Sequence, residues 1–214
     1  MGYADSPTVK TFMSGNKSVK YEVYGQELGG PILILLHGAS GPDSRFYHEQ
    51  AAYFAGKGYT VLMLHYFDGS GSSAPNYENY LEWVQTLDDL IRECQKSTGW
   101  SSRRIAVLGF SLGASVALAA GSQGAQVSAI ADWYGSLPDE FFEKLKGMPP
   151  LLILHGKQDE IIPMVNAQQL VRLCGIAKIT CESHFYAEQN HGFVGSALKD
   201  ADRRTLDFFS RMLK

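Results

Sequence analysis

A serine between two glycines, in the stretch Gly109-Phe110-Ser111-Leu112-Gly113, constrains the fold of this chain more than any other feature. The aliphatic run at residues 104–108 before it predicts a buried strand, and the small residues at 114–120 after it favour a helix. The glycines allow a sharp bend and a close approach of helix to strand. The pattern therefore predicts a strand–turn–helix unit that holds the Ser111 hydroxyl above the end of a sheet, where a nucleophile is held in G-x-S-x-G hydrolases. An ordinary glycine-rich turn is the alternative.

Strands and helices alternate along the rest of the chain. The predicted strands are 19–24, 31–36, 59–65, 104–108, 127–134, 151–155 and 179–186, and the predicted helices are 46–55, 76–96, 114–120, 165–173 and 201–213. This alternation predicts an α/β fold with a mostly parallel central sheet and helices on both faces. Residues 19–24 alternate like a half-buried edge strand, and 68–74 are expected to form a loop. The segment between Tyr134 and Pro150 is too short for a large lid domain.

Composition narrows the class of protein. The chain has 214 residues and a formal charge of −3, which gives no electrostatic reason to expect a nucleic-acid partner. The longest apolar run is too short to cross a bilayer, and no secretory leader is visible. The three cysteines are odd in number and lack metal-binding spacing. We expect a single domain over residues 1–214, a cytoplasmic location, no metal, no cofactor and no membrane contact. The oligomeric state is not determined by the sequence.

Two later loops supply partners for a serine nucleophile. A serine hydroxyl needs a base to take its proton and a third group to orient that base. Asp159 follows the predicted strand 151–155, and His191 follows the predicted strand 179–186. The order Ser111, Asp159, His191 is the chain order of α/β hydrolases. We therefore predict Asp159 as the orienting carboxylate and His191 as the base.

Other residues compete for these two roles. Asp132 and Glu160 are possible substitutes for Asp159, which could instead cap the helix that follows it. The remaining histidines each have an ordinary interpretation as strand-end, core, helix or strand residues: His37, His48, His65, His155 and His184. His155 and His37 both precede a glycine at a strand end and could be structural.

Acyl transfer also needs donors for the negative oxygen of the tetrahedral intermediate. We expect the backbone amides of Leu112, directly after the nucleophile, and of Ala39, in the glycine-containing loop after strand 31–36. A plain turn is the alternative for that loop. The expected substrate-binding residues, which could equally be core residues, are Ser40, Tyr66, Phe67, Phe110, Trp133, Tyr134 and Phe193.

The chain resembles the dienelactone hydrolase family of the α/β-hydrolase superfamily. The resemblance rests on five motifs within residues 31–214: Gly109 to Ala114, Trp133-Tyr134-Gly135, Gly156 to Asp159, Asn190 to Phe193 and Arg204 to Phe209. It implies a compact hydrolase without a lid and places the triad on the residues already chosen.

The chain also departs from the members of that family that act on dienelactone. Those members carry cysteine at the position of Ser111, a glutamate in the first oxyanion loop and arginines for the substrate carboxylate. Here the loop reads His37-Gly38-Ala39, and Arg45 is the only arginine close in sequence to a site loop. We therefore expect a serine carboxylesterase acting on small esters. The alternatives are a dienelactone hydrolase, a thioesterase or acyltransferase with the same triad, a peptidase-like hydrolase and a non-catalytic binding protein.

Overall fold

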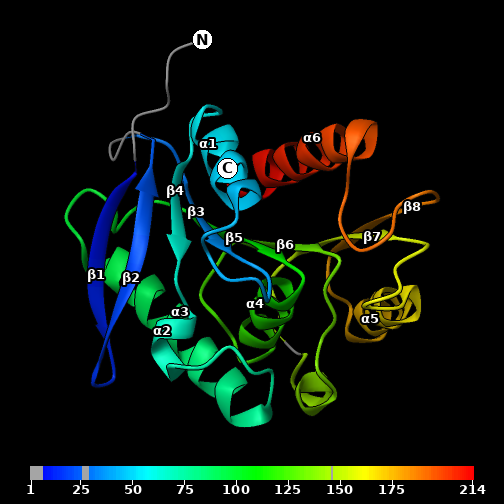
Figure 1. Cartoon of the computed structure of the whole chain (residues 1–214), viewed down its shortest axis with the longest axis horizontal. Coiled ribbons are helices and arrows are strands. Elements are labelled where there is room, and N and C mark those ends of the chain that lie inside the picture. The colour runs from blue at the N-terminus through cyan, green and yellow to red at the C-terminus, as the bar shows by residue number, and fades with distance from the viewer. Residues whose placement is uncertain (1–6, 26–28, 146) are drawn as a thin grey trace.

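The computed structural model, which describes residues 7–25, 29–145 and 147–214, contains one eight-stranded sheet (Figure 1). Its strands lie in the order β1-β2-β4-β3-β5-β6-β7-β8. β2 pairs antiparallel with both of its neighbours, and every other neighbouring pair is parallel. The strands are β1 (Thr8–Ser14), β2 (Lys17–Tyr24), β3 (Ile32–Leu36), β4 (Thr60–Leu64), β5 (Ile105–Phe110), β6 (Ala129–Trp133), β7 (Leu151–Gly156) and β8 (Cys181–Tyr186).

Helices cover both faces of the sheet, as Figure 1 shows. The helices α1 (Arg45–Ala55) and α6 (Gly195–Met212) pack on one face, and α3 (Tyr77–Lys96), α4 (Leu112–Ser122) and α5 (Met164–Ala177) pack on the other. The strands in the middle of the sheet are buried on both faces, which explains their continuous aliphatic sequences. The predicted α/β fold class is therefore confirmed.

The structure corrects two local predictions. The sequence analysis missed strand β1. Because β1 forms the edge of the sheet beside β2, β2 is an interior strand rather than an edge. Residues 68–74, after β4, are predicted to form a loop, but the short helix α2 (Phe67–Ser70) includes the first of them. The short 3-10 helix η1 (Asp139–Lys144) lies between β6 and β7.

Helix α4 is the central element behind the candidate site. All of its residues are buried, because it packs against β3, β5, β6 and α3 at once. Small side chains allow this close packing, and the sequence of α4 is accordingly rich in alanine and glycine. The loops after β3, β5, β7 and β8 meet at the carboxyl edge of the sheet, where open α/β sheets bind their ligands. No helix among the described residues is long and apolar enough to cross a membrane.

Candidate active site

Ser111 occupies a strained turn between β5 and α4. Its backbone angles are φ 53° and ψ −118°, and a non-glycine residue with positive φ is costly unless its surroundings hold it there. The backbone on either side of Ser111 packs tightly against neighbouring segments. A Cβ on Gly109 would lie 2.4 Å from Cα of Ala114, and one on Gly113 would lie 2.4 Å from the Leu36 carbonyl oxygen. The two glycines are therefore required by the approach of α4 to β3 and β5.

A continuous chain of hydrogen bonds links Ser111, His191 and Asp159. The Ser111 hydroxyl lies 2.7 Å from Nε2 of His191, and Nδ1 of the same imidazole lies 2.9 Å from Oδ2 of Asp159. A carboxylate only accepts, so Nδ1 carries the proton and Nε2 is left to accept from the serine hydroxyl. The structure thus brings together the three residues that the sequence placed in the loops after β5, β7 and β8.

The Asp159 carboxylate is fixed by its own loop. Its Oδ1 accepts from the backbone amides of Ile161, at 2.9 Å, and Ile162, at 2.8 Å. The side chain of Asp159 has no exposed surface, whereas that of His191 remains 20% exposed. Asp159 is therefore fixed by its own loop, whereas His191 is accessible from the surface.

The two competing carboxylates lie elsewhere. Asp132, on β6, is fully buried, and its Oδ1 accepts from the amide of Gly135 at 2.8 Å. Burial raises the pKa of this carboxyl to about 7. Glu160 is exposed, and its amide donates to Asn190 Oδ1. Neither carboxylate contacts His191 in the described residues.

The other histidines do not reach Ser111. His37 is fully buried and stacks on the ring of Tyr66 at 4.4 Å, and burial lowers its pKa to about 4. His65 and His48 face Glu22 at 2.9 Å and 3.5 Å. His184 packs against Tyr186 on β8, and His155 lies behind Asp159.

The two expected oxyanion donors belong to segments next to Ser111. Leu112 is the first residue of α4, so its amide has no acceptor within the helix. Ala39 lies in the loop after β3, and its amide has no hydrogen-bond partner in the part of the chain described. A Cβ on Gly38 would lie 3.4 Å from Cβ of Ser111, which places the loop directly against the nucleophile.

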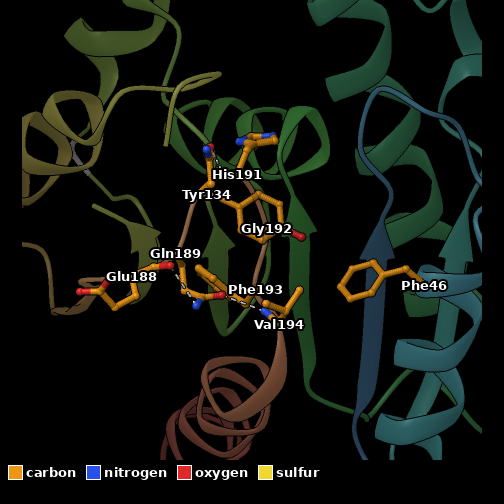
Figure 2. Close-up of a pocket in the computed structure, with 9 residues that line it drawn as sticks. Phe46, Tyr134, Glu188, Gln189, His191, Gly192, Phe193 and Val194 are labelled. Atoms are coloured by element: carbon orange, nitrogen blue, oxygen red, sulfur yellow. Dashed lines mark hydrogen bonds between the residues drawn. The ribbon is translucent and has the colours of Figure 1, made fainter. Parts of the chain in front are cut away.

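A cavity of about 390 Å³ opens beside His191. Figure 2 shows Tyr134 and Phe46 on two sides of it, with Phe193 and Val194 lower in the view. Its lining also includes a polar side formed by the loop before His191. The full lining is Phe46, Tyr134, Glu188, Gln189, Asn190, His191, Gly192, Phe193 and Val194.

The structure separates the expected pocket residues into two groups. Tyr134 and Phe193 line the cavity, and their contact with a substrate stays a prediction. Tyr66, Phe110 and Trp133 have no exposed surface, so their predicted contact with substrate is wrong. Their large rings instead pack in the core between the sheet and its helices, as aromatic residues at strand ends often do.

The last two expected pocket residues lie away from this cavity. Phe67, on α2, packs between the rings of Tyr66 and Trp83. Ser40, in the loop that carries Ala39, is exposed. Its hydroxyl lies 3.5 Å from the hydroxyl of Tyr47 on α1.

Sequence reasoning missed most of the cavity lining. Phe46 lies at the start of α1, and its apolar side chain gave no signal that distinguishes it from a core residue. Residues 188–190 directly precede His191, and that adjacency was the available signal. Among the described residues that line the cavity, Glu188 is the only carboxylate, and none is a lysine or arginine. Within the described residues, no group of three or more histidine, cysteine, aspartate or glutamate side chains could hold a metal ion.

Comparison with known proteins agrees with this architecture. A putative dienelactone hydrolase from Klebsiella pneumoniae superposes with a TM-score of 0.79 at 20% identity, covering 95% of this chain and 98% of that chain. Thermogutta terrifontis esterase 2, phosphorylated by paraoxon, has a TM-score of 0.78 at 16% identity, covering 98% and 95%. At these identities the likeness shows the fold, which is that of an α/β hydrolase.

The family follows from the sequence match. The model of the dienelactone hydrolase family matches residues 23–213, and this chain belongs to that family. It is also 26% identical over 225 residues to the prolyl endopeptidase FAP of Bos taurus. That match covers 86% of this chain but only 28% of the relative. The chain thus spans little more than a quarter of the length of the curated relatives it matches.

Proposed function

We propose that this protein is a serine hydrolase that cleaves small carboxylic esters through an acyl-enzyme on Ser111. The single observation that carries the proposal is the hydrogen-bond chain from the Ser111 hydroxyl through His191 to Asp159. His191 Nε2 is within reach of the hydroxyl proton, and Asp159 fixes the tautomer that can take it.

The reaction has two halves on these residues. His191 takes the proton as Ser111 Oγ attacks the ester carbonyl, and the amides of Leu112 and Ala39 stabilise the oxyanion. His191 then gives the proton to the leaving alcohol, which departs as the acyl-enzyme forms. Water, deprotonated by the same imidazole, attacks the acyl-enzyme; the bond to Ser111 Oγ breaks, the acid is released, and His191 returns the proton to Oγ. Asp159 stabilises the imidazolium in each half.

The size and the lining of the cavity favour small, uncharged esters as substrates. Its volume of about 390 Å³ is near the lower end for small-molecule sites, and its apolar side is formed by Phe46, Tyr134, Phe193 and Val194. Because the described residues of its lining include no lysine or arginine, none of them compensates a substrate carboxylate. A carboxylate-bearing lactone is therefore the weaker candidate.

The test combines covalent labelling with a substrate panel. A fluorophosphonate probe and paraoxon should each add one group to the wild-type protein, and Ser111→Ala should abolish both additions. Ser111→Ala should also lower kcat for p-nitrophenyl acetate by roughly a thousandfold or more. Ser122→Ala is the matched control, because its hydroxyl bonds to the Ala119 carbonyl within α4, away from the site. Full activity in Ser111→Ala would refute the proposal.

The same panel separates the alternatives. Esters of increasing acyl length, a thioester, a dienelactone and a proline-containing peptide amide are compared by kcat/KM. The peptide amide is included because the curated relatives are named prolyl endopeptidases. We expect short esters to be preferred. A higher kcat/KM for any other class would reassign the substrate while leaving the serine mechanism in place.

A further inference from the structure

His155 is a second histidine in contact with the Asp159 carboxylate. It lies near the end of β7 and has no exposed surface. Its Nε2 is 2.7 Å from the carbonyl oxygen of Ile162 and 3.3 Å from Oδ2 of Asp159, the oxygen that also receives Nδ1 of His191. Its Nδ1 is buried and has no hydrogen-bond partner in the described residues.

These contacts fix the proton on His155. A carbonyl oxygen only accepts, so the nitrogen facing Ile162 carries the hydrogen, and Nδ1 carries none. Burial lowers the pKa of this imidazole, which keeps it neutral. The Nε2 hydrogen is therefore donated to the Ile162 carbonyl, and the Asp159 carboxylate lies 3.3 Å from the same polar N–H of a neutral imidazole.

We propose that His155 is a positioning residue for the Ser111 hydrolase, acting through Asp159; this inference rests on the proposed function. Its polar N–H, 3.3 Å from Oδ2, stabilises the charge of the carboxylate and favours the orientation in which Oδ2 faces His191. By also binding the Ile162 carbonyl, it anchors the loop whose amides hold Oδ1 of Asp159.

Few other ionisable groups act on this contact. On the loop after β7, Lys157 and Glu160 are both exposed to solvent, which screens their charges. From the segment after β6, the ring of Tyr134 packs against His191 at 5.1 Å, and burial raises its pKa, so it stays neutral. From the loop after β8, His191 itself is the one group that changes charge during the reaction.

Loss of the His155 donor has two expected effects. Asp159 becomes a stronger acceptor, which favours protonated His191, so the acid limb of the kcat/KM profile moves to higher pH by about half a unit. The loop that holds the carboxylate also loses its bond at the Ile162 carbonyl, so kcat falls roughly tenfold, the size of one lost hydrogen bond, while KM changes little.

The experiment compares His155→Leu with His155→Gln. The glutamine amide can donate from near the position of Nε2, so His155→Gln should keep the wild-type acid limb and most of kcat, whereas His155→Leu should show both effects. His184→Leu is the control, because His184 lies on β8 and packs against Tyr186 instead of the triad. If His155→Leu does not fold, His155→Met gives the same comparison.

A second measurement does not depend on turnover. The low-field proton resonance of the His191 Nδ1–H···Asp159 bond should shift in the leucine variant and stay near its wild-type position in the glutamine variant. A wild-type acid limb and kcat in His155→Leu, or equal losses in both variants, would overturn the proposal. Activity retained in Ser111→Ala would instead refute the serine mechanism, and the proton resonance would still report the effect of His155 on Asp159.

Discussion

Replacing Asp132 by asparagine should make the protein's stability less dependent on pH. The Asp132 carboxyl is fully buried on β6, and within the described part of the chain only its Oδ1 has a partner, the amide of Gly135 at 2.8 Å. Burial raises its pKa from 3.8 to about 7, because no nearby cation compensates the charged form. Asparagine has the same shape and keeps the acceptor for Gly135, but it does not titrate.

The sign follows from proton binding in the two states. Below pH 3.8 the carboxyl is protonated in both the folded and unfolded chain and contributes nothing. Between pH 3.8 and about 7 it is ionised only when unfolded, so the free energy of unfolding falls as pH rises. Above about pH 7 the loss is complete and constant. At about 1.4 kcal/mol per pH unit, the loss between pH 5 and 8 is on the order of 3 kcal/mol.

The assay is urea unfolding of the wild type and Asp132→Asn at pH 5, 6, 7 and 8. Because other carboxyls titrate in both proteins, only the difference between the two curves is interpreted. That difference should change by about 3 kcal/mol in favour of the variant as pH rises. A difference that stays constant over this range would refute the argument. Esterase activity of the variant should stay within about threefold of wild type, because Asp132 does not contact His191.

Three further changes test the packing and hydrogen bonds around the site. Gly113→Ala should lower the free energy of unfolding by about 3 kcal/mol or prevent folding, because the new Cβ would lie 2.4 Å from two backbone carbonyl oxygens. Gly175→Ala should instead stabilise α5 slightly, because a Cβ there would meet no described atom within 4 Å apart from its own stretch of helix. Thr205→Val should cost about 1–3 kcal/mol by denaturant unfolding, since it removes the acceptor 3.0 Å from the buried Trp133 indole N–H, and Thr205→Ser should restore most of the loss. Asn190→Ala should lower kcat/KM about tenfold, because Asn190 Oδ1 accepts from the amides of both Glu160 and His191; unchanged kinetics would show that the loops hold the acid and base without it.

The sequence was most informative where the chemistry is local. The turn at Ser111 needs glycines at fixed positions beside it, so its pattern predicts both the strand–turn–helix unit and the position of the hydroxyl. The alternation of aliphatic strands and helices likewise predicts the parallel sheet. In such a sheet all the carboxyl ends lie along one edge, which is why Asp159 and His191 could be named from their loops.

The tertiary structure alone decided which side chains face which space. Tyr66, Phe110 and Trp133 are as aromatic as Tyr134 and Phe193, yet the first three are core residues and the last two line the cavity. The same holds for His155, which shares its strand-end pattern with His37 but lies against the Asp159 carboxylate. The physical reason is that local sequence sets backbone conformation, whereas burial and contact depend on neighbours brought together from distant parts of the chain.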